Sequence, residues 1–88
     1  MARYRVELLP AAVRALRRLD RPVRVRVAAA IDALADEPRP PGAKALTGMP
    51  GLLRIRVGDY RIIYDVIDAE LLVEVITLGH RREVYRQP

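Results

Sequence analysis

The fold of this chain is decided by residues 52–64, which read LLRIRVGDYRIIY. Apolar and polar residues alternate on both sides of the Gly58-Asp59 dipeptide, as they do in strands with one buried face. A dipeptide that begins with glycine suits the loop of a two-residue hairpin. Such a loop sets a pairing in which Arg56 lies directly opposite Arg61. The stretch therefore predicts a β-hairpin with an apolar inner face and a basic outer face.

Outward from this hairpin, the sequence patterns predict further strands and a pair of helices. Period-2 alternation predicts strands, apolar residues at helical spacing predict an antiparallel helix hairpin, and clustered Pro and Gly predict a loop. The expected elements are a strand at 3–9, helices at 11–19 and 23–34, an irregular loop at 37–51, strands at 52–57, 60–67 and 71–78, and a polar tail at 79–88. The order β-α-α-β-β-β predicts one α+β domain over residues 1–88, with an antiparallel sheet and the helix hairpin packed on one face.

Composition excludes several classes of protein. The chain has 88 residues, no cysteine and one histidine, which excludes a disulfide scaffold and a thiolate zinc site. No apolar stretch approaches the ~20 residues that a membrane span needs, and the first residues lack the apolar core of a secretory signal. We therefore expect a cytoplasmic protein that uses no membrane, no metal ion and no cofactor.

The charge of the chain is strongly positive. The net charge is +5, and arginine supplies 15 of the 16 basic residues. A small basic protein typically binds a polyanion or an acidic partner, and arginine favours bidentate contacts to phosphate. GC-rich coding DNA also enriches arginine, so composition alone does not separate these two causes.

The outer face of the hairpin is the first candidate site. It carries Arg54, Arg56 and Arg61, and like charges directly opposite each other destabilise a sheet by about 0.2–1 kcal/mol. A chain optimised only for folding would place a carboxylate or threonine there, so we interpret this face as an anion clamp. The alternative is a solvated face whose charge is partly balanced by Glu74, which a second two-residue hairpin would place diagonal to Arg61.

The first helix offers a second basic face, made by residues at positions i, i+3, i+4 and i+7. Either this is an ordinary solvated helix face, or it contacts nucleic-acid phosphates without sequence specificity. Its members are Arg14, Arg17, Arg18 and Arg21.

His80 is the third feature, because imidazole is the side chain suited to proton transfer near neutral pH. Strict alternation through the last strand puts it on the same face as Arg61. Tyr85 lies in an otherwise polar tail, where it either packs on the sheet edge or stacks on a base. A histidine at a strand end can equally be structural. Because no clustered acidic residues are visible to hold magnesium, nuclease chemistry would have to be metal-free.

Three segments together resemble the RelE branch of the RelE/ParE toxin superfamily. They are Leu46-Thr-Gly-Met-Pro-Gly, Arg54-Ile-Arg-Val-Gly-Asp-Tyr-Arg-Ile-Ile-Tyr and Gly79-His-Arg-Arg-Glu-Val-Tyr. The resemblance implies a microbial-RNase-like fold and the toxin half of a toxin–antitoxin pair, with a RelB-like antitoxin as partner. It implies metal-independent cleavage of messenger RNA in the ribosomal A site, by attack of a ribose 2′-OH that leaves a 2′,3′-cyclic phosphate.

The resemblance also implies roles for individual residues. Arg54 and Arg56 stand where other members hold and polarise the phosphate, and Arg61 matches the arginine that stabilises the transition state. Arg81 matches a second catalytic arginine, and Tyr85 matches a tyrosine that stacks on the base or assists proton transfer. Our hypothesis is that His80 shares the general acid/base role with Tyr85. Two rival functions stay open: a ParE-type toxin that inhibits DNA gyrase without cleaving RNA, and a module that only binds RNA or antitoxin.

Overall fold

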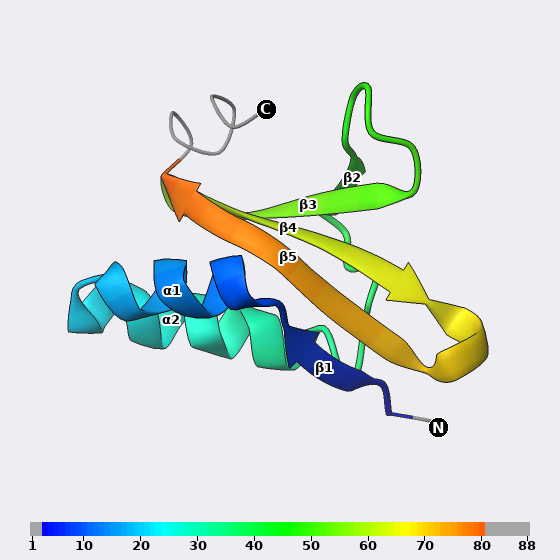
Figure 1. Cartoon of the computed structure of the whole chain (residues 1–88), viewed down its shortest axis with the longest axis horizontal. Helices are drawn as coiled ribbons and strands as arrows, with labels where there is room; N and C mark the ends of the chain where they lie inside the picture. The colour runs from blue at the N-terminus through cyan, green and yellow to red at the C-terminus, as the bar shows by residue number, and fades with distance from the viewer. Residues whose placement is uncertain (1–2, 81–88) are drawn as a thin grey trace.

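The computed structural model describes residues 3–80, which form two helices packed on one face of a five-stranded sheet (Figure 1). The α+β class and the helix hairpin on one face are therefore confirmed. The elements are β1 (Arg5–Leu8), α1 (Pro10–Arg18), α2 (Arg21–Ala33), β2 (Lys44–Ala45), β3 (Leu52–Val57), β4 (Tyr60–Ile67), a short 3-10 turn η1 (Asp68–Glu70) and β5 (Leu72–His80).

The β3–β4 hairpin has the pairing that its loop predicts. Val57 pairs with Tyr60, and Arg56 lies opposite Arg61 in antiparallel register. Gly58 takes a positive φ of 60° at the first loop position, where a side chain would be strained. The local sequence thus fixes both the turn and the register.

The sheet differs from the prediction at both of its edges. The strand order is β1-β5-β4-β3-β2, and β1 runs parallel to β5, so the sheet is mixed and not wholly antiparallel. The helix hairpin separates β1 from the other strands and leaves its direction open. At the other edge, Lys44 and Ala45 form β2 inside the segment expected to be an irregular loop. Two residues are too short for any periodicity to reveal.

The core lies between the helices and the inner face of the sheet. Val27 and Ile31 of α2 pack with Ile62, Tyr64 and the apolar residues of β5, and Val27, Ile62 and Tyr64 are fully buried. Pro10 is the first residue of α1, where its missing N–H and fixed φ suit a helix start.

A bulge in the β4–β5 ladder changes which face the end of β5 presents. Tyr64 pairs with Val75 but Ile63 pairs with Thr77, so Ile76 has no opposite residue in β4. One extra residue reverses the side-chain alternation beyond it. The end of β5 is therefore out of phase with its beginning.

Two sequence expectations are corrected by this pairing. His80 lies opposite Tyr60, whose ring packs on the core, so His80 is on the helix-covered face and not on the face of Arg61. Glu74 pairs with Asp65 and is not diagonal to Arg61, because the β4–β5 connection contains η1 and is longer than two residues. Glu74 therefore does not balance the basic outer face.

A polar cluster fixes the start of the long loop to the β4–β5 turn. Arg39 donates two hydrogen bonds to the carboxylate of Asp68, at 3.2 and 2.9 Å, and the Tyr4 hydroxyl donates a third at 2.6 Å. These donors lower the pKa of Asp68 to about 2. The Tyr64 hydroxyl donates to the carbonyl oxygen of Pro38 at 2.8 Å, and burial raises the pKa of Tyr64 to about 12. The loop that leads to β2 is thus held at its beginning.

Candidate anion-binding face

Four cationic side chains lie in two neighbouring rows on the outer side of β2, β3 and β4. Lys44 pairs with Arg54, and Arg56 pairs with Arg61. We call these four residues the outer basic face. Sequence reasoning found the three arginines but missed Lys44, because the segment around it was expected to have no strand. The only signal for it was a lone lysine shortly before the hairpin.

The members of the outer basic face differ in exposure. Arg61 is only 9% exposed, Arg54 is half-buried, and Arg56 and Lys44 are exposed. Neither Arg54 nor Arg56 forms an ion pair with a carboxylate among residues 3–80. A guanidinium group presents a rigid fork of donors that matches phosphate oxygens. A largely buried arginine beside two more accessible ones can thus hold an anion and stabilise charge that develops on it.

A cavity of about 490 Å³ borders this face at the edge of β3. Its apolar walls come from the end of α2 and the proline-containing loop, and its charged lining consists of Lys44, Arg54, Arg56 and one carboxylate, Glu37. The cavity gives an extended ligand on the outer basic face a place to continue past the sheet edge.

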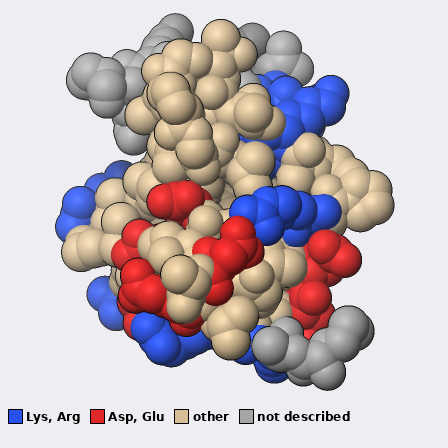
Figure 2. Space-filling view, turned by 90° about the vertical axis from the view of Figure 1, so that its right-hand side faces the viewer, with Lys and Arg blue, Asp and Glu red and all other residues tan. Residues whose placement is uncertain are grey.

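Charge is distributed unevenly along the outer side of the sheet. At the end away from the outer basic face, Asp65, Glu74 and Glu7 lie side by side on β4, β5 and β1. Figure 2 looks onto the end of the molecule that holds the β4–β5 turn, where acidic and basic side chains are neighbours, as the Arg39–Asp68 ion pair requires. The carboxylates are thus separated from the outer basic face.

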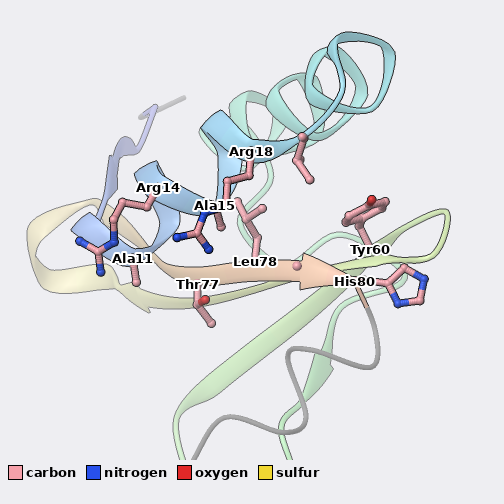
Figure 3. Close-up of a pocket in the computed structure, with 10 residues that line it drawn as sticks. Ala11, Arg14, Ala15, Arg18, Tyr60, Thr77, Leu78 and His80 are labelled. Carbon is pink, nitrogen blue, oxygen red and sulfur yellow. The ribbon is translucent and has the colours of Figure 1, made fainter.

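The structure divides the four helix arginines that the sequence grouped together. α1 ends at Arg18, and Arg21 is the first residue of α2, so the predicted face does not continue across the corner. Arg14 and Arg18 line a cavity of about 530 Å³ between α1 and the ends of β4 and β5, together with His80 (Figure 3). Arg17 is exposed and does not line this cavity.

The remaining predicted site residues are not brought together in the described part of the chain. His80 belongs to the cavity beside α1, on the opposite side of the sheet from Arg61, because of the bulge. Arg81 and Tyr85 lie outside the described residues. The burial pattern of β5 shows the shift, because the core residues Val73, Val75 and Leu78 are spaced by two and then by three. The sequence does not show it, because Ile76 between them is apolar as well.

Two further properties hold for residues 3–80. No group of three or more His, Cys, Asp or Glu side chains is arranged to hold a metal ion there. Neither helix is long and apolar enough to cross a membrane.

Comparisons with known proteins agree on one family. The model of the family "ParE toxin of type II toxin-antitoxin system, parDE" matches residues 6–85. A "Putative RelE-like toxin protein" of Escherichia coli is 30% identical over 81 residues, which span 90% of this chain and 84% of the relative.

Solved structures agree with this match. The RelBE2 toxin–antitoxin complex of Mycobacterium tuberculosis contains a chain with a TM-score of 0.81 and 29% identity, over 92% of this chain and 94% of that one. A mutant of the Escherichia coli toxin RelE in the free state has a TM-score of 0.77 and 31% identity, over 98% of this chain and 93% of the toxin chain. A chain of the archaeal RelE–RelB complex of Pyrococcus horikoshii also has a TM-score of 0.77, with 32% identity over 89% of this chain and 94% of that one.

Proposed function

We propose that this chain, which belongs to the ParE/RelE toxin family and is the toxin of a RelBE-type toxin–antitoxin system, is an endoribonuclease that cleaves messenger RNA in the ribosomal A site. Its antitoxin partner is a RelB-like protein, as in the similar complexes. Cleavage would stop translation, which is how the toxin would act on the cell.

One observation supports the proposal most directly. Arg56 lies opposite Arg61 in the β3–β4 ladder, and the neighbouring row adds Lys44 and Arg54. Such a pair weakens the sheet by about 0.2–1 kcal/mol. A function that needs concentrated positive charge at this place accounts for the presence of two arginines in opposite positions. A phosphodiester that gains negative charge in its transition state is a substrate with that need.

The proposed reaction requires no cofactor. The 2′-oxygen of a ribose attacks the adjacent phosphorus while its proton passes to a general base. The bond from phosphorus to the 5′-oxygen of the next nucleotide breaks, and a general acid protonates that oxygen. The products are a 2′,3′-cyclic phosphate and a 5′-hydroxyl, with no oxidation or reduction.

Each basic residue has a proposed part in this reaction. Arg54 and Arg56 hold the phosphate, and Arg61, the most buried of the three arginines, stabilises the charge on the phosphorane. We assign Arg81 to the role of a second catalytic arginine and Tyr85 to the role of a proton carrier. His80 is a weaker candidate for proton transfer than the sequence indicates, because the bulge turns it to the other side of the sheet.

The experiment that tests this function is in-vitro translation with toe-printing, which maps cleavage on messenger RNA in the ribosome. We expect the wild type to cut at A-site codons and leave cyclic phosphate ends. We expect Arg61→Ala to slow cleavage about 10²–10³-fold, which is typical for loss of one donor to the transition-state charge. Arg26→Ala removes the same charge from an exposed position on α2 and serves as the matched control. Circular dichroism checks that both variants fold.

Two results would contradict the proposal. Intact messenger RNA together with stalled gyrase–DNA complexes would indicate a ParE-type toxin. RNA binding without any cleavage by the wild type would indicate a module that only binds.

A further inference from the structure

We propose that the cavity between α1 and the ends of β4 and β5 binds one nucleotide of an RNA chain, at a site separate from the outer basic face. Its walls carry Arg14 and Arg18 from α1, Tyr60 and His80 from the strand ends, and Leu78 between them. Figure 3 shows the two guanidinium groups on one side of Leu78 and the two rings on the other. The cavity thus offers an anion site and an aromatic site at its two ends.

The electrostatics of the cavity favour an anion. None of the described residues that line it is acidic. Neither Arg14 nor Arg18 forms an ion pair with a carboxylate among residues 3–80. Arg18 lies in the last turn of α1, where it also complements the helix dipole, but Arg14 lies a full turn earlier, where that effect has faded. The helix alone therefore does not explain the pair of arginines.

The aromatic side of the cavity suits a base. The rings of Tyr60 and His80 meet edge to face, with centroids 5.7 Å apart and planes at 81°. This arrangement gives the two rings a fixed mutual orientation, and both side chains are only partly buried. A nucleobase can pack against such rings because every base has an aromatic face.

A nucleotide fits the whole cavity better than an acidic peptide does. The volume of about 530 Å³ lies within the range of small-molecule sites. A carboxylate side chain would use the arginines and leave the ring pair unused, whereas a nucleotide uses both ends and lays its sugar over Leu78. The two sites meet at consecutive pairs of the β4–β5 ladder. Tyr60 pairs with His80 in the cavity, and the next pair is Arg61 with Gly79 on the outer basic face. The two RNA sites are therefore on opposite faces of the same strand ends, and binding here does not depend on cleavage.

The first test measures binding of the full chain to a fluorescent 2′-O-methyl hexauridylate, which the proposed reaction cannot cleave. We compare Arg14→Ala/Arg18→Ala with the charge-matched pair Arg17→Ala/Arg21→Ala, which leaves the cavity lining intact. We expect the first pair to lose at least about tenfold in affinity and the second about two- to threefold, since both lose phosphate contacts but only the first loses the site. An equal loss in the two pairs would overturn the proposal.

The second test examines the ring pair. His80→Ala should weaken binding of the same RNA about fivefold or more, the lower range for loss of one stacked base, and His80→Phe should restore most of it. In single-turnover cleavage, His80→Ala should raise the toxin concentration needed for half-maximal rate more than it lowers the maximal rate. A fall in maximal rate of 10² or more with unchanged binding would assign His80 to proton transfer and refute a binding role.

The third test separates RNA from the peptide alternative. NMR signals of the His80 ring should shift when uridine monophosphate is added to the wild type, and not in Arg14→Ala/Arg18→Ala. If that variant keeps its RNA affinity but loses affinity for an acidic antitoxin peptide, the cavity binds protein and the proposal is wrong. Arg61→Ala should slow cleavage about 10²–10³-fold and keep this binding, so failure of the cleavage function and failure of this site give different results.

Discussion

Replacing Arg56 with glutamate should stabilise the fold and remove its function. Arg56 is exposed and lies directly opposite Arg61, so the two guanidinium groups repel each other across the ladder. Glutamate at this position would replace the repulsion with an attraction of similar size. The same change would reverse the charge at a position that we propose holds the substrate phosphate.

The register determines the expected size of the effect. A charged pair directly across a ladder contributes about 0.2–1 kcal/mol, so removal of the repulsion and gain of an attraction together amount to about 1 kcal/mol. For a domain of this size, that free energy corresponds to a rise in Tm of about 4–8 °C. Arg56→Gln, which removes only the repulsion, should give about half of the rise.

The assay is thermal unfolding followed by circular dichroism at low and high salt. The Debye length falls from about 10 Å at 0.1 M salt to about 3 Å at 1 M, so the stabilisation should shrink as salt is added. Arg26→Glu is the control: it makes the same change in net charge on α2, and no charged residue lies three or four positions away on that helix. Its Tm should change little. The toe-printing assay should show loss of cleavage in Arg56→Glu only.

Two results would refute this reasoning. If Arg56→Glu lowers Tm at low salt, the arginine pair does not weaken the sheet and the argument for a functional origin fails. If both glutamate variants raise Tm equally, the gain comes from lower net charge and says nothing about the cross-strand pair.

The polar cluster at the β4–β5 turn gives two further predictions. Because the pKa of Asp68 is lowered to about 2, its bonds to Arg39 and Tyr4 stabilise the fold fully above about pH 4 and lose this effect as the pH falls through about 2. Asp68→Asn should therefore be less stable than the wild type in urea unfolding at pH 7, with a difference that shrinks below about pH 4 and vanishes only below about pH 2; a difference independent of pH would contradict this. Tyr64→Phe should lower the unfolding free energy by about 1 kcal/mol, because the Pro38 carbonyl loses its donor, and an unchanged urea midpoint would show that water replaces the bond.

The part of the fold that sequence predicts well is the part whose information is local. Gly58 and Asp59 set the turn, and the turn sets every pair of the β3–β4 ladder, including Arg56 with Arg61. Pro10 likewise marks the start of α1. These features depend on residues that are neighbours in the chain, so periodicity and turn chemistry are enough to predict them.

The parts that sequence missed depend on distant pairing or on a single added residue. The direction of β1 is set by its partner β5 at the far end of the chain, and β2 exists because Lys44 and Ala45 meet the edge of β3. The bulge at Ile76 adds one residue within a run of apolar side chains, where two faces look alike. Nothing local distinguishes these outcomes from a longer loop or a regular strand.

The bulge has the greatest effect on the function that we propose. Without it, His80 would stand on the outer side with Arg61, and one compact site would hold both the arginine and the imidazole. With it, Gly79 takes the place opposite Arg61 and His80 pairs with Tyr60 on the helix side. One inserted residue therefore divides the polar end of β5 between two faces. The bulge thus separates the imidazole from Arg61 and places it in the cavity that Arg14 and Arg18 of α1 also line.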